Sequence, residues 1–394
     1  MFATLFPILG ITFIDILGFS ILIPIMPYYV EHFGASKVVV GVLFSTFAAC
    51  QFVAAPLWGH LSDRIGRKAV LIVSQIGATV GWTMLAFAPS IVWVFAARIV
   101  EGASGGNISV TQAYVSDRVA PAQRARAFAW VGVAFSCGIV IGPAAGALLL
   151  ARYGYTIAFL LAAALQVVTL VTTILFLPEQ VAAKGETSEA IAFREIIRSL
   201  VEPVLTPLLV QKLAYSLGLY AWFAVFALVL QVQLGFGVVQ TSYFFAAFGV
   251  LSIIFQLGVV GRLADRIGVR AASNVGFASM VAFFAIVPFA RDLTAFAWTM
   301  PLFGLGMALS NATIPALLTD AAPEGMRGSI LGVGSSLESI SGIVMPVIAT
   351  AVLALYGTPW TTSICATFVC LALALGLVAQ RRATLALPEP VEAE

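Results

Sequence analysis

The feature that most limits what this chain can fold into is its succession of long apolar runs. One α-helix needs roughly 20 apolar residues to cross a hydrocarbon core of about 30 Å. Twelve runs of that kind follow one another between polar breaks. The sequence therefore predicts membrane spans over residues 3–30, 37–60, 69–88, 90–116, 124–151, 155–177, 206–234, 239–261, 271–290, 293–319, 327–356 and 359–380.

The composition of the chain also favours a membrane protein. Of the 394 residues, 61% are hydrophobic and only 10% are charged, whereas soluble globular proteins carry about 25% charged residues. We expect the first apolar run to be a span rather than a cleaved signal peptide, because it is longer than a signal peptide's apolar region. The four cysteines lie in apolar segments without the spacing of metal ligands, so no metal site is predicted.

The longest polar stretch separates the first six predicted spans from the last six. Within it, apolar residues recur at helical spacing opposite charged ones, which predicts a short amphipathic helix at the membrane surface. The end of the chain is acidic and contains proline, so we expect a disordered tail. The predicted domains are an N-terminal six-helix bundle (1–178), a cytoplasmic linker with the amphipathic helix (179–205), a C-terminal six-helix bundle (206–383) and the tail (384–394).

Basic residues are divided unequally between the two sets of loops. If both termini are cytoplasmic, sixteen of the 20 lysines and arginines fall on the cytoplasmic side, Lys212 among them. Three fall on the outer side, and Arg98 lies inside a span. Because cytoplasmic loops carry an excess of Lys and Arg, this pattern predicts cytoplasmic termini.

The two halves of the chain repeat each other. GHLSDRIGRK at 59–68 matches GRLADRIGVR at 261–270. Parallel repeats of six spans are typical of transporters whose substrate site lies between two bundles. We therefore predict two bundles that face each other across a cavity. Further matches link Asp117, Arg124 and Pro143 to Asp320, Arg327 and Pro346.

The segment GHLSDRIGRK occupies the short turn between the second and third predicted spans. Its basic residues alone could be a topology signal, but that does not explain the glycines, the aspartate or the second copy. Residues 59–68 match every fixed position of the loop signature of the major facilitator superfamily, which the chain resembles along its length. The resemblance implies an all-α membrane protein with 12 transmembrane helices in two pseudo-symmetric six-helix bundles. It also implies a cytoplasmic gating motif made of Gly59, Asp63, Arg64, Gly66, Arg67, Lys68, Asp117, Asp265 and Arg266.

Within the superfamily, the chain is similar to the twelve-span drug:proton antiporters, the group that contains the tetracycline exporters. The similarity includes LGFSILIPIMP after Asp15, RIVEGASGG at 98–106 and GIVIGPAAGALL at 138–149. Tetracycline exporters carry an aspartate in the third span where this chain has Gly81. The resemblance therefore supports the class of exporter better than it supports tetracycline as the cargo.

The segment at 138–149 resembles the antiporter packing motif. Gly138, Gly142 and Gly146 recur every four residues, so another helix can approach that face closely. Pro143 bends the helix and leaves a backbone carbonyl to be satisfied by its neighbours. The resemblance implies that this motif shapes the interface between the two halves, whereas a generic packing face of small residues is the alternative.

Four ionisable residues lie well inside predicted spans, where a charged side chain costs about 2.5–3.5 kcal/mol on insertion scales. Such residues normally face a bundle interior or a wet cavity. Two of the carboxylates lie about 11 residues into their spans, a depth of roughly 16 Å that is close to the midplane. A carboxylate there could bind a transported proton or hold a cationic substrate. We predict proton-coupling roles for Asp15, Glu338, Glu101 and Arg98.

Each of these four residues also has a structural interpretation. Arg98 and Glu101 are three residues apart on one helical face, so they could simply neutralise each other. The resemblance instead implies that Arg98 tunes the proton affinity of a carboxylate. Asp15 could accept a structural hydrogen bond from a neighbouring helix, and the serines around Glu338 could satisfy its carboxylate.

The resemblance also implies a cavity lined mostly by spans 1, 4, 7 and 10. Aromatic side chains there would suit bulky lipophilic cations, although tryptophan and tyrosine also serve as packing residues. The candidate cavity residues are Asn107, Gln112, Gln211, Tyr215, Tyr220, Trp222 and Asn311.

The sequence has no phosphate-binding loop, no paired-carboxylate layout and no histidine cluster, so we expect neither an enzyme nor a nucleotide-driven pump. We expect proton-coupled efflux of amphipathic or cationic small molecules by rocker-switch alternating access, in a bacterial cytoplasmic membrane. The alternatives are a proton-coupled transporter of a defined metabolite (a sugar, amino acid or lipid) and a non-transporting receptor or scaffold. The expected partners are the substrate, protons and the bilayer, with no nucleic acid, no cofactor other than the proton gradient, and a monomeric state.

Overall fold

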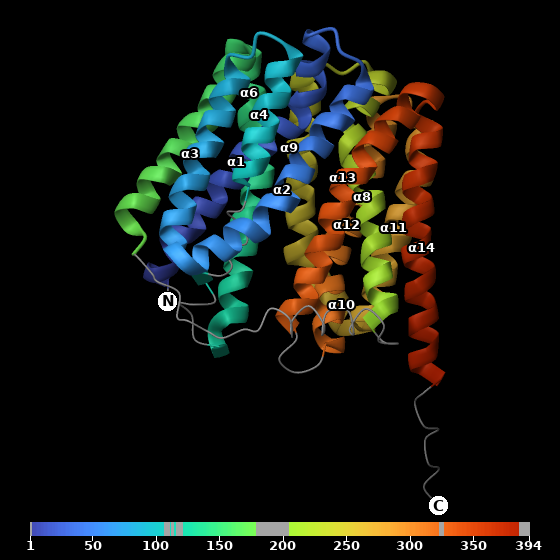
Figure 1. The fold of residues 1–394 in the computed structure, drawn as a ribbon. Helices are drawn as coiled ribbons and strands as arrows, with labels where there is room; N and C mark the ends of the chain where they lie inside the picture. Colours follow the sequence, from blue (N-terminus) through green and yellow to red (C-terminus); the bar gives the residue numbers. More distant parts are fainter. Residues whose placement is uncertain are drawn as a thin grey trace, which may run out of the picture. The chain divides into compact units, whose positions relative to one another are not determined.

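The computed structural model describes residues 2–105, 111, 114–115, 121–178, 205–322 and 327–385, and every regular element in these ranges is a helix (Figure 1). Ten helical stretches among the described residues are long and apolar enough to cross a membrane. Large apolar side chains on them are exposed, such as Leu257 (81%), Trp298 (77%) and Leu175 (68%). A water-facing surface rarely carries so many exposed apolar side chains, so the chain is an integral membrane protein.

In the first half of the chain, the helices follow the predicted spans to within a few residues. The predicted span 90–116 has α4 as its described part, and most of its second half lies outside the described residues. These helices are α1 (Phe2–His32), α2 (Lys37–Ile65), α3 (Arg67–Ala86) and α4 (Ile91–Ser104).

The next element, α6 (Pro121–Phe176), joins the two predicted spans 124–151 and 155–177 in one long helical stretch. Its backbone breaks at Gly154, whose φ of 78° lies in the left-handed region that L side chains rarely adopt. The position of the break matches the predicted turn between those two spans.

In the second half, the predicted span 239–261 is not one regular helix. A π-helical turn, Gln256–Val260, interrupts it between α9 and α10. The linker predicted at 179–205 and the tail predicted at 384–394 fall outside the described residues except at their inner ends. The helices are α8 (Leu205–Leu234), α9 (Val238–Phe255), α10 (Gly261–Ile267), α11 (Val269–Ile286), the 3-10 turn Val287–Phe289, α12 (Leu293–Ala321), α13 (Arg327–Tyr356) and α14 (Thr358–Leu385).

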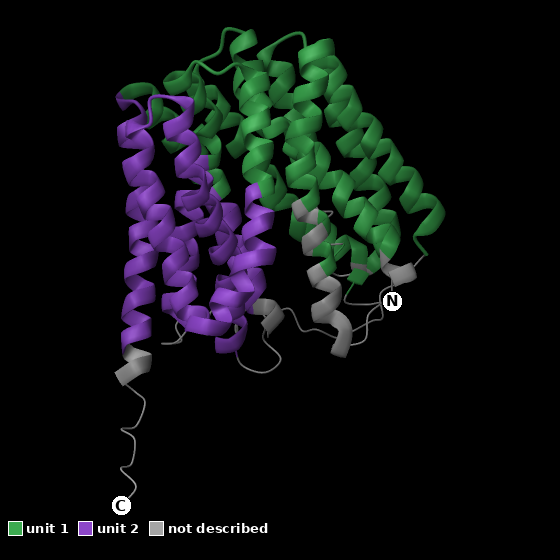
Figure 2. Ribbon diagram, turned by 180° about the vertical axis from the view of Figure 1, so that it is seen from behind, with its two compact units in different colours: residues 1–186, 223–250, 342–355 green, residues 187–222, 251–341, 356–394 purple. Residues whose placement is uncertain are grey.

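The chain divides into two compact units (Figure 2). Unit 1 contains residues 1–186, 223–250 and 342–355, and unit 2 contains 187–222, 251–341 and 356–394. Three helices, α8, α9 and α13, are therefore split between the units. Unit 1 includes all of the described first half of the chain. From the second half it takes parts of α8, α9 and α13. The predicted domain boundaries remain a prediction.

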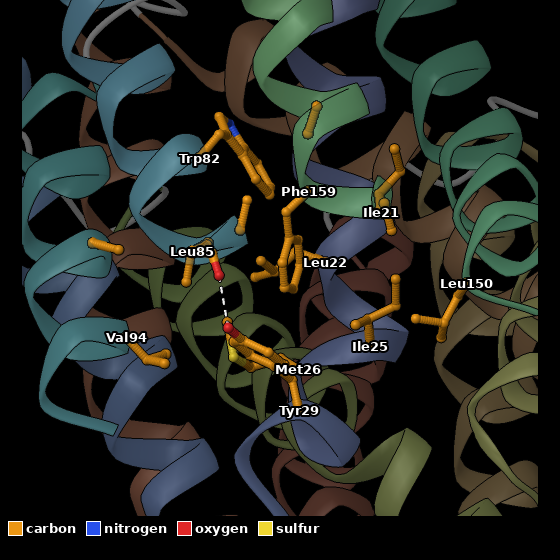
Figure 3. Close-up of a cluster of buried hydrophobic side chains, with 14 of the residues drawn as sticks. Ile21, Leu22, Ile25, Met26, Tyr29, Trp82, Leu85, Val94, Leu150 and Phe159 are labelled. Carbon is orange, nitrogen blue, oxygen red and sulfur yellow. Dashed lines mark hydrogen bonds between the residues drawn. The ribbon is translucent and has the colours of Figure 1, made fainter. Parts of the chain in front are cut away.

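The core of unit 1 lies between α1, α3 and α6 (Figure 3). Tyr29 is central to it, because its ring meets that of Phe159 edge-on at 4.9 Å and its hydroxyl donates a 2.6 Å hydrogen bond to the carbonyl of Leu85. Trp82 packs beside Phe159. Since lipid tails are as apolar as these side chains, close packing and internal hydrogen bonds, rather than release from water, hold such helices together.

Candidate functional site

An ion pair joins Lys212 of α8 to Glu338 of α13 in unit 2. The Lys212 ammonium donates a hydrogen bond to Oε1 of Glu338. The two partners differ in exposure, because the Lys212 side chain is 9% exposed and the Glu338 side chain 38%. The carboxylate is therefore the more accessible of the two groups, whereas most of the ammonium group's surroundings are protein.

The position of Lys212 corrects one part of the sequence prediction. The predicted orientation counted Lys212 among the cytoplasmic-side charges, but it is buried within a candidate membrane span, Leu205–Leu234. Its depth is roughly 10 Å from the start of α8 at 1.5 Å per residue. The missed signal was a lone lysine next to Gln211, and three residues before Tyr215, in an otherwise apolar run.

Two predicted cavity residues lie beside this ion pair. The centre of the Tyr215 ring is 5.9 Å from Nζ of Lys212, and the Tyr215 hydroxyl donates a 2.9 Å hydrogen bond to Oδ1 of Asn311 on α12. Tyr215 is buried and Asn311 is exposed. Tyr220 is also near enough to interact electrostatically with Glu338. The pair thus has an aromatic and amide border of the kind predicted for the cavity.

The serines around Glu338 do not take up its carboxylate. Ser335, Ser336 and Ser339 each donate to the carbonyl four residues earlier in α13, at 3.1–3.2 Å. Their side chains satisfy the helix backbone instead. The structure therefore disfavours the alternative in which these serines hydrogen-bond to the Glu338 carboxylate. The described partner of that carboxylate is Lys212.

Other predicted cavity residues have packing roles in unit 2. Trp222 is fully buried in an aromatic cluster, with its ring 5.1 Å from Phe283 and 5.5 Å from Phe284. Gln211 donates a 3.0 Å hydrogen bond to the carbonyl of Ala372 on α14. These contacts pack both side chains within unit 2, and their predicted role in the cavity stays a prediction. Asn107 and Gln112 lie outside the described residues.

In unit 1, Arg98 and Glu101 of α4 form a buried ion pair. Nη2 of Arg98 lies 2.5 Å from Oε2 of Glu101, and both side chains are at most 4% exposed. The guanidinium carbon also stands 4.4 Å from the centre of the Phe47 ring. A Cβ at Gly81 of α3 would lie 2.3 Å from Cγ of Glu101, so the glycine makes room for this carboxylate.

The glycines of the predicted antiporter motif pack against α1, the helix that carries Asp15. A Cβ at Gly138 would lie 2.9 Å from the backbone nitrogen of Leu17, and one at Gly142 would lie 1.9 Å from Oγ of Ser20. Ser20 donates a 2.8 Å hydrogen bond to the carbonyl of Gly138. Asp15 is half-buried, about one turn of α1 before this contact.

The rest of the motif follows the same arrangement. Gly146 faces Ile21 of α1, and Pro143 is buried within α6. On another side of this segment, Val140 fills the space beside Gly249 of α9, where a Cβ would lie 2.8 Å from Val140 Cγ2. Within unit 1, the motif thus joins a first-half helix to a second-half helix.

Further contacts inside unit 1 tie the end of α1 to the α8–α9 turn. The Tyr28 hydroxyl lies 2.6 Å from the Thr241 hydroxyl and donates a 3.0 Å hydrogen bond to the carbonyl of Phe236. Nε2 of Gln231 donates to Oε2 of Glu31 at 2.7 Å. These polar contacts lie about four turns of α1 beyond Asp15.

The two copies of the predicted gating motif share a backbone conformation. Gly66 separates α2 from α3 with φ 95° and ψ 150°, and Gly268 separates α10 from α11 with φ 85° and ψ 153°. Only glycine adopts such angles readily, which explains why both copies carry it. Around the first copy, Arg67 donates to Oγ of Ser62, and Lys68 donates a 2.8 Å hydrogen bond to the carbonyl of Ile174.

The structure describes only some of the other residues of the predicted gating motif. Gly59 is half-buried, and Arg64, Asp265 and Arg266 are exposed. The side chain of Asp63 and the whole of Asp117 lie outside what is described. The predicted role of these residues in gating stays a prediction.

Comparison with known proteins assigns the family. The model of the Major Facilitator Superfamily matches residues 8–346 and 259–394. The chain belongs to the major facilitator superfamily. The glycine turns at 66 and 268, and the close contact of the α6 glycines with α1, therefore belong to a member of this superfamily.

Similar curated proteins of this superfamily are bacterial resistance proteins. The class B tetracycline resistance protein of Escherichia coli is 26% identical over 86% of each chain. Multidrug resistance protein 2 of Bacillus subtilis is 25% identical over 85% of this chain and 84% of its own, and the efflux pump PmrA of Streptococcus pneumoniae is 26% identical over 89% and 90%. These relatives match the predicted drug:proton antiporter group, so the chain is a membrane transporter and not an enzyme.

Solved structures share the fold at lower identity. The human organic anion transporter MFSD10 has a TM-score of 0.72 with 22% identity, covering 95% of this chain and 99% of its own. A POT family transporter in complex with 5-aminolevulinic acid has a TM-score of 0.79 with 12% identity, covering 96% of each chain. These two likenesses extend over nearly the whole chain and concern the fold alone.

Proposed function

We propose that this transporter exports amphipathic small molecules that carry a cationic group, in exchange for protons entering from outside. In this proposal, the chain forms two six-helix bundles that alternate access by a rocker-switch motion. It acts as a monomer in a bacterial cytoplasmic membrane with both termini inside. The similarity to tetracycline resistance and multidrug efflux proteins supports this direction and this broad cargo.

The observation that carries the proposal is the Lys212–Glu338 ion pair. Its carboxylate is 38% exposed and therefore accessible to a cation, yet it already has a basic partner. A substrate cation must compete with that partner for Glu338. Antiport requires at least this kind of competition, because binding of the substrate and binding of the proton must exclude each other in the carrier.

The Arg98–Glu101 pair is less suited to this exchange. It is local to one helix turn, and neither side chain is more than 4% exposed. Removing one partner from a buried pair costs about 3–5 kcal/mol, so the pair would remain closed during the cycle. We assign it a structural role and keep Asp15 of α1 as a second candidate for coupling.

Alternating access requires that contacts between the two halves of the sequence break in turn. Contacts that would have to break include Tyr28 with Thr241 and Glu31 with Gln231 within unit 1. With cytoplasmic termini, α1 ends on the outer side, so these contacts would close the outer end. The cluster at 59–68 would close the cytoplasmic end in the opposite state.

Transport into proteoliposomes tests the proposal. We expect uphill movement of ethidium, tetraphenylphosphonium or rhodamine 6G when a pH gradient is imposed, and none without it. Glu338→Gln should abolish the gradient-driven movement, and Asp15→Asn tests the second candidate. Wild-type protein that moves none of these cations under a gradient, or moves them equally well without one, contradicts the proposal.

Transport of a defined metabolite is the alternative function for the same fold. The proteoliposome panel separates the two, because a metabolite transporter would select one sugar, amino acid or lipid and reject structurally unrelated cations. The relatives' names favour efflux of drugs over this alternative.

A further inference from the structure

We propose that the proton exchanged for substrate is carried on Nζ of Lys212, and that Glu338 stays ionised throughout the cycle. This inference rests on the proposed function and goes beyond it by naming the atom that carries the proton. The sequence alone suggested carboxylates as the carriers, because it did not reveal that a lysine lies inside the same site.

The unequal burial of the two partners is the first step of the argument. Lys212 is 9% exposed, so its ammonium depends on Glu338 for compensation of its charge. Glu338 is 38% exposed, so its carboxylate has more room for a new partner than the lysine has. Breaking the pair therefore leaves the lysine, and not the carboxylate, as the poorly solvated charge.

The second step follows when a cationic substrate binds Glu338. The carboxylate then pairs with the substrate, and the Lys212 ammonium is left buried beside a second cation. A buried group relieves that cost by giving up its charge. Nζ releases one proton to water and becomes a neutral amine, so the site keeps the same net charge with substrate bound as without it.

The third step is the return. When the substrate leaves on the outer side, Glu338 loses its cation and the amine of Lys212 takes up one proton from outside. The ammonium then pairs again with Oε1 of Glu338, as in the structure. One substrate cation moves out for each proton that moves in, and no carboxylate has to be protonated.

Among the residues of unit 2 that the structure describes, two tyrosines and an arginine do not offer this exchange. On α8, Tyr215 and Tyr220 are neutral phenols, and the Tyr215 hydroxyl is engaged with Asn311 of α12. Elsewhere in unit 2, Arg270 on α11 stays charged at accessible pH and donates to the carbonyl of Ala379 on α14. Of the described contacts of Glu338, Lys212 thus provides a basic group that can both hold and lose a proton.

Binding of ethidium to the purified full-length protein in detergent tests the inference. Ethidium is a permanent cation and cannot itself supply the proton. If binding releases one proton, the apparent Kd should fall about tenfold for each unit of rising pH, and isothermal titration in buffers of different ionisation enthalpy should report about one proton released. Lys212→Gln should remove the proton release and reduce the pH dependence to less than twofold per unit, while binding itself persists because Glu338 is still present.

Two further variants sharpen the test. Lys212→Arg keeps the charge and the pairing but does not give up a proton, so it should weaken ethidium binding at least tenfold without proton release. Lys37→Gln, a change of the same type at the start of α2, should leave the proton release intact. Thermal unfolding of each variant checks that the protein is folded.

The inference is overturned if Lys212→Gln still releases a proton or still drives ethidium uphill under a pH gradient, since a carboxylate would then carry the proton. That failure differs from failure of the proposed function. The proposed function fails when the wild-type protein shows no gradient-driven export, whatever Lys212→Gln does.

Discussion

Gly81 of α3 and Glu101 of α4 touch so closely that a Cβ added at position 81 would lie 2.3 Å from Cγ of Glu101. The carboxylate of Glu101 therefore occupies space that any larger residue at position 81 would need. Since Glu101 also pairs with Arg98 at 2.5 Å, the glycine is part of how this chain buries two opposite charges between helices.

Gly81→Ala should destabilise the protein, because even one methyl group must displace Glu101 and disturb its pair with Arg98. Overpacking of this kind costs about 1–3 kcal/mol. The midpoint of thermal unfolding in detergent measures the effect. Gly10→Ala is the matched control, since no atom lies within 4 Å of a Cβ there, and equal midpoints for the two variants would contradict the account of Gly81.

The two partners of the unit 2 ion pair should respond unequally to neutralisation. Glu338→Gln leaves the buried Lys212 without its counter-charge and should cost a few kcal/mol, below the 3–5 kcal/mol of a fully buried pair. Lys212→Gln leaves unpaired the more exposed of the two groups, so a smaller loss of about 1 kcal/mol is expected. Unfolding midpoints of the two variants check this order, and a larger loss for Lys212→Gln would show that the burial argument is wrong.

The sequence predicted most helices to within a few residues because spans of about 20 apolar residues are a strong and local signal. The motif at 59–68 and its copy at 261–270 also predicted the family, and the matching glycine turns at 66 and 268 are a structural trace of the repeat. The π-helical turn Gln256–Val260 was not predicted, because its apolar sequence does not differ from that of a regular span.

The candidate site was predicted less completely. The sequence singled out Glu338 but not Lys212, because pairs between helices 126 positions apart leave no local pattern. For Arg98 and Glu101, their spacing of three residues was enough to predict the pair. Trp222 was a candidate for the cavity, yet its ring is enclosed by aromatic neighbours that sequence spacing could not bring together.

The contact between α6 and α1 should be sensitive to the smallest added side chain. Gly142→Ala would bring a Cβ to 1.9 Å from Oγ of Ser20 and 2.6 Å from the carbonyl of Leu17, and the backbone atom cannot move aside cheaply. We expect a loss of about 1–3 kcal/mol together with reduced transport per folded molecule. Gly332→Ala on α13, which has open space around it, should change neither quantity, and an unaffected Gly142→Ala would refute the packing role.

The polar contact between Glu31 and Gln231 should have to open in each transport cycle. In a variant whose four cysteines are replaced by serine, cysteines at positions 31 and 231 joined by a short thiol-specific cross-linker should reduce transport at least tenfold. Cleavage of a reducible linker should restore it. Full activity of the cross-linked protein would mean that α1 and the α8–α9 turn stay together throughout the cycle.

Proton movement driven by substrate alone tests the central claim most directly. Proteoliposomes containing the protein are loaded with ethidium and a pH-sensitive dye, with the same pH on both sides, and then diluted into ethidium-free buffer. The account predicts that ethidium leaving the vesicles drives protons into them, in a ratio near one, and that Glu338→Gln removes both fluxes. Ethidium efflux through the wild-type protein with no change in internal pH would contradict it.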